Sequence, residues 1–238
     1  MANALLKVTD ADVRIGGSLV VRGLSLEIMA AETVCLLGRN GAGKTTTIRA
    51  IMGAIPFAAG HLWFEGNDLT SAPAHRRAVA GIAWAPQDRR LFRDLTVAEN
   101  LAVAATFTRR RRDAFWTENR LYSLFPRLAE RRRQSAGLLS GGEQRMLAIA
   151  RALVTNPKLL LLDELTDGLA PIVVEQLLET VHNIAAAGTA ILLAEQNVHF
   201  AAALASRGYL IDKGTIRATG HVSALLADEA LVASHLAL

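Results

Sequence analysis

Cysteine and long apolar stretches are scarce in this sequence, and each shortage excludes a class of protein. The single cysteine, Cys35, cannot form an internal disulfide, and its apolar surroundings indicate packing rather than redox or metal chemistry. No stretch approaches the about 18 consecutive apolar residues of a membrane-spanning helix. Residues 1–4 lack the basic region of a secretory signal, and the histidines have no metal-ligand spacing. We therefore expect a soluble chain that stays inside the cell.

The composition suits one α/β domain with an added lobe, because 238 residues with 51% hydrophobic side chains can bury a sizeable core. The net charge is only +4, but arginine is clustered at residues 109–112 and 131–133. A solvated helix face is the simpler interpretation of both clusters, and contact with anionic lipid headgroups is the alternative. The middle third shows no aromatic residues spaced for base stacking, so we expect no nucleic-acid partner.

Residues 38–45 predict a phosphate-binding loop. Glycines in this segment let backbone N–H groups crowd around a triphosphate, Lys44 adds positive charge near the β- and γ-phosphates, and the Thr45 hydroxyl can bind Mg²⁺. The apolar run 33–37 predicts a buried strand before the loop, and Thr46 and Thr47 begin a helix whose positive end faces the anion. The pattern predicts binding of ATP or GTP. The nucleotide-binding residues in this segment are Gly38, Arg39, Asn40, Gly41, Ala42, Gly43, Lys44, Thr45 and Thr46.

A second part of the site is predicted where the apolar run 159–162 ends in two acids, Asp163 and Glu164. Such a run is typical of a central parallel strand, and ligands of open α/β sheets bind at the carboxyl ends of their strands. We expect Asp163 to hold Mg²⁺, through water, and Glu164 to polarise the water that attacks the γ-phosphate. The simpler alternative is a strand that emerges at the surface with two solvated acids.

Residues 139–143, Leu-Ser-Gly-Gly-Glu, predict a second anion site. Ser140 and Glu143 have the spacing of a capping box, which explains a helix start but not the glycine pair between them, since glycine destabilises a first helical turn. Exposed N–H groups at a positive helix end suit a phosphate. One chain cannot readily fold both anion sites onto the same phosphate, so we expect a second nucleotide-bound chain to face this one.

Taken together, these segments resemble the ATP-binding subunits of ABC transporters, from about Leu5 to Leu236. The phosphate loop, the signature segment 139–143 and the acidic strand occur in that family's order. The resemblance implies an α/β fold: a P-loop NTPase (RecA-like) core with a mainly parallel sheet, an N-terminal antiparallel β part and an inserted α-helical subdomain. The core would span about residues 5–87 and 155–236. The helical subdomain, with the signature helix, would span about 88–154.

The resemblance also implies a head-to-tail dimer, in which the signature segment of one chain closes on the γ-phosphate held by Lys44 of the other. Gln87 becomes the Q-loop residue near Mg²⁺ and the attacking water, and Asp167 falls in the D-loop, which crosses the dimer interface. The residues that this adds to the nucleotide site are Ser140, Gly141, Gly142, Glu143 and Asp167. The implied metal ligands are Thr45, Gln87 and Asp163.

Within that family, the likeness is to the LivF-type ATPases of branched-chain amino acid importers, on segments 88–92, 124–128, 130–134 and 168–171. Gln196, in Glu-Gln-Asn at 195–197, stands where most members have a histidine, and this branch resembles one that uses glutamine. An amide can donate to a phosphate but cannot transfer a proton at neutral pH. The resemblance therefore implies Glu164 as the general base, with Gln87 and Gln196 as the other catalytic residues.

The sequence departs from the family pattern at two places that bear on the site. Ile15 stands where an aromatic residue usually stacks on adenine, so about 1 to 3 kcal/mol of stacking is missing, by analogy with base stacking elsewhere. Leu165 replaces a proline after Glu164, and Thr166-Asp167 is unusual for a D-loop, which could loosen the placement of Glu164. No phosphate or metal ligand is lost, so we expect hydrolysis.

The cofactors implied are ATP and Mg²⁺, and the location is the cytoplasmic face of the inner membrane. The implied partners are transmembrane permeases, a second ATPase of the LivG type or a second copy of this chain, and indirectly a substrate-binding protein. One alternative is an ABC-type ATPase of DNA repair or translation, which would ordinarily show a tandem ATPase domain, a long coiled coil or zinc cysteines. A second alternative is a P-loop kinase or GTPase acting alone, which would not need residues 139–143.

Overall fold

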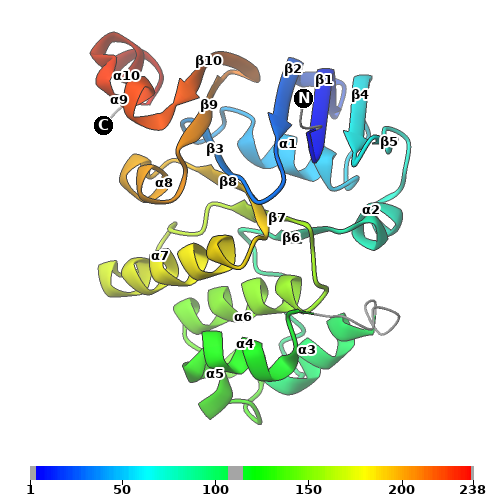
Figure 1. Cartoon of the computed structure of the whole chain (residues 1–238), viewed down its shortest axis with the longest axis vertical. Helices are drawn as coiled ribbons and strands as arrows, with labels where there is room; N and C mark the ends of the chain where they lie inside the picture. The colour runs from blue at the N-terminus through cyan, green and yellow to red at the C-terminus, as the bar shows by residue number, and fades with distance from the viewer. Residues whose placement is uncertain (1–3, 107–114, 237–238) are drawn as a thin grey trace.

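The computed structural model describes residues 4–106 and 115–236, and its centre is a six-stranded sheet (Figure 1). The strand order is β10-β9-β3-β8-β7-β6. Neighbouring strands from β9 to β6 run parallel, whereas β10 is antiparallel to β9. In that order the strands span Thr215–His221, Arg207–Asp212, Thr33–Leu37, Ala190–Glu195, Leu159–Asp163 and Ile82–Ala85. Parallel pairing places the carboxyl ends of β3, β8 and β7 at the same edge, where ligands of open α/β sheets bind.

Both faces of this sheet are buried because its central strands are apolar on both sides. In β7, Leu159 and Leu161 belong to one hydrophobic cluster, and Leu160 and Leu162 belong to the other. The strand β3 alternates between the two clusters in the same way. Since successive side chains of a strand point to opposite faces, a continuous apolar run is what a sheet covered on both sides requires.

One face of the sheet is covered by α1 (Lys44–Ile51) and by a smaller antiparallel sheet. That sheet has the order β2-β1-β4-β5, with strands Ser18–Ile28, Leu6–Ile15, Ala59–Phe64 and Asn67–Asp68. The helix α1 contacts strands of both sheets. The fully buried Arg77 of α2 (Ala74–Ala80) donates to the carbonyl oxygens of Ala50 and Ile51, so the last carbonyls of α1 are satisfied.

Helices cover the other face. Their bounds are α3 Val97–Ala105, α4 Glu118–Leu124, α5 Pro126–Glu130, the 3₁₀ turn η1 Ala136–Leu138, α6 Gly141–Leu153, α7 Pro171–Ala186, α8 Val198–Leu204, α9 Val222–Ala227 and α10 Glu229–His235. The helices α3 to α7 fill the lower half of Figure 1, whereas α8, α9 and α10 lie at its upper left. Side chains cap several of these helices at the N-terminus, where Thr96, Thr117, Ser140 and Asn197 accept backbone N–H groups. Among the described residues, no helix is both long and apolar enough to cross a membrane.

The observed elements follow the predicted α/β architecture, with local differences at element ends. The helix after the phosphate loop begins at Lys44 rather than at Thr46, because Gly43 with φ of 112° already serves as its N-cap. After His221 the chain forms two short helices, and Asp228 caps the second one. The arginine cluster 109–112 lies outside the described residues, whereas residues 131–133 are exposed after α5.

The buried thiol of Cys35 gives a test of the packing between sheet and helices. Cys35 is fully buried in β3, and burial raises the pKa of its thiol to about 12. We expect no reaction with Ellman's reagent at pH 8 in the folded protein, because the thiolate is the reactive form. Unfolding in guanidinium should release one thiol per chain, measured by absorbance. Rapid labelling of the folded protein would contradict this packing.

Candidate nucleotide site

The phosphate loop joins β3 to α1 and curls at two glycines. Gly41 and Gly43 have φ angles of 81° and 112°, values that residues with a side chain rarely adopt. A side chain at Gly38 would collide with the carbonyl oxygen of Ile211. The first turn of α1 contains no acidic residue, so its positive end remains available to an anion. Of the other predicted loop residues, Arg39 and Asn40 are exposed, Ala42 is buried, and Thr46 is half-buried in α1.

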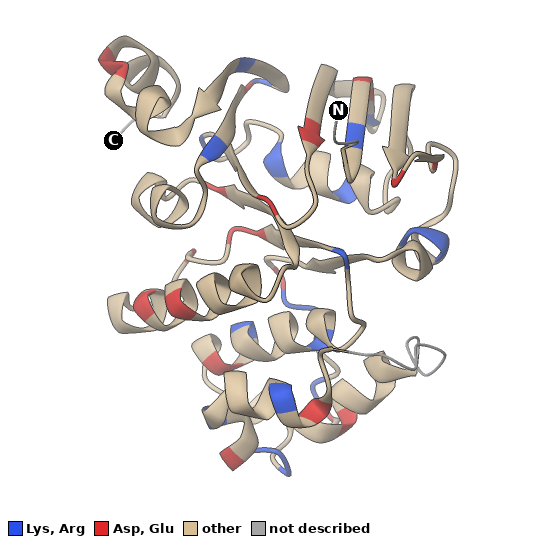
Figure 2. Cartoon of the chain, viewed as in Figure 1, with Lys and Arg blue, Asp and Glu red and all other residues tan. Residues whose placement is uncertain are grey.

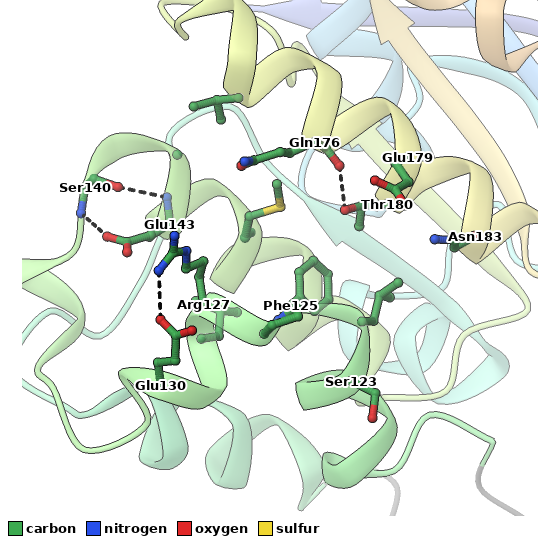
Figure 3. Close-up of a pocket in the computed structure, with 16 residues that line it drawn as sticks. Ser123, Phe125, Arg127, Glu130, Ser140, Glu143, Gln176, Glu179, Thr180 and Asn183 are labelled. Atoms are coloured by element: carbon green, nitrogen blue, oxygen red, sulfur yellow. Dashed lines mark hydrogen bonds and ion pairs between the residues drawn. The ribbon is translucent and has the colours of Figure 1, made fainter.

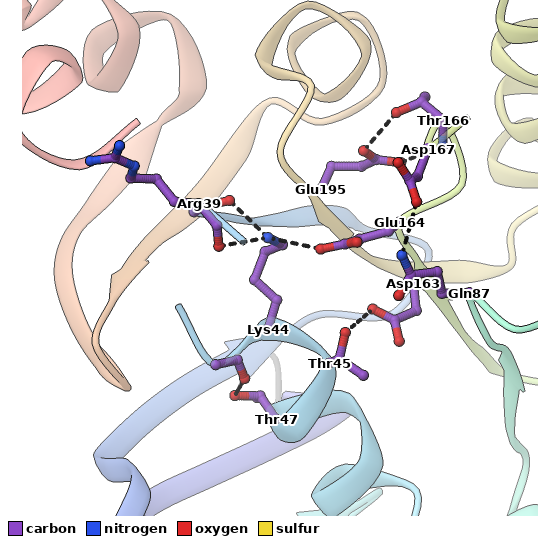
Figure 4. A network of polar contacts seen from close by, with 12 residues as sticks. Arg39, Lys44, Thr45, Thr47, Gln87, Asp163, Glu164, Thr166, Asp167 and Glu195 are labelled. Atoms are coloured by element: carbon purple, nitrogen blue, oxygen red, sulfur yellow. Dashed lines mark hydrogen bonds and ion pairs between the residues drawn. The ribbon is translucent and has the colours of Figure 1, made fainter. Parts of the chain in front are cut away.

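Lys44 is the buried cation of the loop, with 2% of its surface exposed. Its Nζ donates to the carbonyl oxygens of Gly38 at 2.8 Å and Arg39 at 3.0 Å, and it lies 3.0 Å from Oε1 of Glu164 (Figure 4). All three contacts are to oxygen atoms that carry negative or partial negative charge. Phosphate oxygens are stronger acceptors of the same kind, so the ammonium group is already directed at the position that a triphosphate needs.

Asp163 and Thr45 form a pair suited to a hard cation. Thr45 donates its hydroxyl to Oδ1 of Asp163 at 2.9 Å, while Oδ2 of the fully buried carboxylate has no partner among the described residues. Burial raises the pKa of Asp163 to about 6, and the neighbouring Glu164 adds to the rise. An unpartnered buried carboxylate oxygen beside a hydroxyl is a donor set that Mg²⁺ prefers. No group of three or more His, Cys, Asp or Glu able to hold a metal occurs in the described part of the chain, so a bound ion needs further oxygens from the nucleotide or water.

Glu164 reaches Lys44 because its backbone turns sharply at the end of β7. Its φ angle is 46°, in the left-handed region, and its N–H donates to the carbonyl oxygen of Ala194 at 2.9 Å. Such a conformation costs a non-glycine residue about 1 to 3 kcal/mol and is common in active sites. The backbone bond and the ion pair with Lys44 hold it in place.

The predicted Q-loop and D-loop residues contact each other. Gln87 donates through Nε2 to Oδ2 of Asp167 at 3.0 Å (Figure 4), and the structure shows no contact of Gln87 with Asp163. Gln196 is exposed after β8 and lines a cavity of about 320 Å³ together with Asn40, Glu164 and Asp167. The three predicted catalytic residues therefore lie around one edge of the sheet, just after the ends of β6, β7 and β8.

Glu195 belongs to this network and was missed by the sequence analysis. It is 1% exposed at the end of β8, and it accepts hydrogen bonds from the N–H and hydroxyl of Thr166 at 3.1 and 3.0 Å. Burial raises its pKa, while these bonds and the N–H of Leu165 oppose the rise. A proline at 165 would have no N–H to offer, so the observed leucine supports Glu195. The sequence feature that could have indicated Glu195 is its position as an acid at the end of an apolar strand, directly before Gln196.

The signature turn, residues 140–143, begins α6 on the helical side of the molecule. Ser140 accepts the N–H of Glu143, and Glu143 accepts the N–H of Ser140 at 2.8 Å through Oε2 and pairs through Oε1 with Arg131 at 2.6 Å. A side chain at Gly142 would lie 2.7 Å from Cγ1 of Val173 in α7, so packing explains this glycine. Gly141 is exposed, and no comparable backbone or core contact requires it.

A cavity of about 550 Å³ extends from the signature turn between α4, α5 and α7 (Figure 3). It does not include the phosphate loop. The turn thus lies outside the network of Figure 4, as expected if it serves a second nucleotide site. Arginines and acids are interspersed along the helices in the lower half of Figure 2.

Comparison with known proteins decides the family. A family model described as ABC transporter matches residues 21–167. This chain belongs to the ABC transporter family. It is the ATP-hydrolysing subunit of a transporter, so the resemblance and the enzyme class inferred from the sequence are confirmed, and a P-loop kinase or GTPase is excluded.

Two curated relatives of this ABC ATPase serve different transport systems. It is 43% identical to the high-affinity branched-chain amino acid transport ATP-binding protein BraG of Pseudomonas aeruginosa over 194 residues, 81% of this chain and 82% of BraG. It is 38% identical to the lipopolysaccharide export system ATP-binding protein LptB of Escherichia coli K12 over 215 residues, 90% of this chain and 89% of LptB.

Solved structures confirm the predicted fold class. An ATP-binding cassette of an ABC transporter in its ADP conformation superimposes with a TM-score of 0.83 at 24% identity, covering 97% of this chain and 98% of the other. A dimeric cassette with ADP and phosphate bound gives 0.79 at 20% identity, covering 91% and 98%. The ABC ATPase thus has the same fold as cassettes that bind nucleotide.

The Lys44 contacts predict how much one charge contributes to nucleotide binding. We expect Lys44→Ala to weaken MgATP binding by at least about tenfold, because a charge-assisted contact to the phosphates is lost. Binding of a fluorescent ATP analogue measures the loss. Lys158→Ala is the matched control. Lys158 pairs with the exposed Glu65, and it directly precedes β7, at the opposite end of that strand from Asp163. Equal affinities of both variants would contradict the site.

Proposed function

We propose that this chain hydrolyses ATP in a site completed by a second cassette, and that the resulting motion powers import of branched-chain amino acids or related small polar solutes. The observation that carries the catalytic part is the convergence of Lys44, Asp163 and Glu164 at one sheet edge. It joins a phosphate-binding cation, a candidate metal ligand and a base within one network.

The chemistry follows from these positions. Residues 38–46 bind the phosphates, with Lys44 on the β- and γ-phosphates, and Thr45, Asp163 and Gln87 would hold Mg²⁺. Mg²⁺ supplies charge neutralisation of the phosphate oxygens. Glu164 accepts a proton from water as the water oxygen bonds to the γ-phosphorus, the bond to the bridging oxygen breaks, and ADP leaves. Gln87 positions that water, and Gln196 donates to the γ-phosphate, since an amide cannot serve as the base.

The second half of the site comes from the signature turn of a facing cassette. Ser140, Gly141 and Gly142 offer a hydroxyl, backbone N–H groups and the positive end of the 13-residue helix α6, and Ser140 and Gly141 are exposed. Glu143 fixes the turn through its bonds to Ser140 and Arg131. Asp167 of the D-loop contributes at the interface. Loss of the γ-phosphate removes the contacts that hold two such chains together, and the pair reopens.

Transport requires partners, and their identity is inferred from similarity. We assign residues 5–87 and 155–236 to the core and 88–154 to the helical subdomain, with transmembrane permeases docking between the two. The facing cassette is a second copy or a LivG-like ATPase, and a substrate-binding protein delivers the solute. The chain then acts as a peripheral subunit on the cytoplasmic face of the inner membrane. Amino-acid import is supported by segments 88–92, 124–128 and 168–171 and by the 43% identity to BraG.

A second candidate is lipopolysaccharide export. It is favoured by the alignment with LptB, which covers more of this chain than the alignment with BraG, 90% against 81%. Identity is lower, 38% against 43%, and we therefore rank import first. Selectivity resides in the membrane subunits of either system, so the catalytic proposal holds for both.

Replacing the base tests the composite site. We expect Glu164→Gln to bind ATP but to turn over at least about 100-fold more slowly, because the amide cannot accept the proton. The purified variant should accumulate as an ATP-bound dimer. Phosphate release measures turnover, and light scattering after size exclusion measures the dimer.

Glu229→Gln, an exposed acid at the start of α10, is the matched control and should remain active. Normal turnover in Glu164→Gln would show that Glu164 is not the general base. If Glu164→Gln is inactive and stays monomeric at saturating ATP, the facing cassette is not a second copy of this chain.

The companions of the chain test the transported solute. A tagged chain purified from its native membranes should bring down permeases, a second ATPase and a binding protein. That binding protein should bind leucine, isoleucine or valine in isothermal titration, with urea and short amides as the related solutes to compare. Companions that bind lipopolysaccharide instead would overturn the import assignment in favour of export.

A further inference from the structure

Arg145 is a buried arginine for which the functions above have no use. It lies in α6, five residues after Ser140, and only 2% of its surface is exposed. Its Nη1 donates to the carbonyl oxygens of Gln87 at 2.8 Å and Pro86 at 3.3 Å. The helix that begins with the signature turn is therefore bonded directly to the backbone of the Q-loop.

The charges around Arg145 come from the elements that form the nucleotide site. Burial lowers its pKa, as does the neighbouring Arg89, while Glu195, Asp167 and Asp163 favour its charged form. These acids lie at the ends of β8 and β7 and in the D-loop. The guanidinium group thus lies within the electrostatic field of the acidic sheet edge, although it bonds to none of the three carboxylates.

A second connection runs from the Q-loop to the signature turn. Arg89 donates through Nη1 to Oε1 of Gln144 at 2.9 Å, and Gln144 donates through Nε2 to the carbonyl oxygen of Leu139 at 3.1 Å. Leu139 directly precedes Ser140. Arg89 also has a positive φ of 60°, so the Q-loop turn is held in an uncommon conformation where it contacts α6.

Packing alone explains Arg145 less well than it explains Arg77. The buried Arg77 uses Nε, Nη1 and Nη2 on backbone carbonyls, as expected of a group that only satisfies helix and loop ends. Nε of Arg145 is buried and has no partner among the described residues. A buried, incompletely satisfied charge is costly to stability, and a hydrophobic side chain of similar volume is often as stable or more so.

We propose that Arg145 is a positioning residue that transmits the position of the Q-loop at residues 86–87 to the signature turn of the same chain. When Gln87 shifts toward the γ-phosphate, its own carbonyl moves with it, and the two bonds from Arg145 shift α6 in the same direction. Nucleotide held by one chain thereby aligns the turn that this chain presents to its partner. The inference rests on the composite site proposed above.

The test compares two variants of Arg145 with a half-buried arginine from the same helix. Arg145→Met keeps the length of the side chain without its donors, and Arg145→Lys keeps one charged donor. Arg151→Met is the control: Arg151 is also in α6, and its guanidinium packs over Phe92 without a hydrogen bond to residues 86–87. For each variant, kcat, KM for ATP and Tm are measured.

We expect Arg145→Met to lower kcat by at least about tenfold with KM within about twofold, because the phosphate loop is untouched. Arg145→Lys should lie between this variant and the parent, and Arg151→Met should match the parent. A parent-like kcat in Arg145→Met overturns the proposal, as does an equal loss in Arg151→Met with a matching fall in Tm. If only the lysine variant folds, a parent-like kcat for it is the overturning result.

Hydrogen exchange separates this inference from the composite site. In a Glu164→Gln background, ATP should slow exchange in both residues 38–45 and residues 139–147. Adding Arg145→Met should leave the first response and abolish the second, and the ATP-dependent dimer should decrease. If Glu164→Gln alone never forms a dimer, a composite site made of two copies of this chain fails. If it forms one and Arg145→Met changes neither exchange nor dimer, only the role of Arg145 fails.

Discussion

The parallel register of β3, β8 and β7 fixes where the phosphate loop and the buried acids of the nucleotide site leave the sheet. Leu37 pairs with Glu195, and Asp163 pairs with Ala194, so the phosphate loop, the Asp163–Glu164 pair and Glu195 all leave the sheet at one level. A shift of one residue would turn each side chain to the opposite face. The backbone pairing of a sheet that is apolar on both faces therefore sets the geometry of the catalytic residues.

That edge concentrates acids whose charged forms are disfavoured by burial. Asp163 and Glu195 both have raised pKa values, and each is partly relieved by hydroxyl or N–H donors from Thr45 and Thr166. Lys44 sits among the oxygens of its own loop and Glu164. The site is thus balanced internally, and a ligand that brings both phosphate and a divalent cation can replace these contacts without leaving a buried charge unpaired.

The sequence predicts those parts of the fold and of the nucleotide site whose residues are consecutive in the chain. The phosphate loop and the acidic strand were found because their chemistry is encoded in consecutive residues, and the apolar runs of β3 and β7 reveal a sheet covered on both sides. The bonds from Arg145 to the Q-loop and from Thr166 to Glu195 join positions 58 and 29 residues apart, and no periodicity records them. Likewise, the Gln87–Asp167 bond depends on the neighbouring placement of β6 and β7 in the sheet.

The tight approach of Gly142 to Val173 has a consequence for how sequences of this kind can diverge. Gly142 in α6 has no side chain, and the space that a Cβ would occupy there is filled by the branched side chain of Val173 in α7. A larger residue at position 142 can be accommodated only together with a smaller one at position 173. We therefore expect substitutions at these two positions to occur together rather than independently.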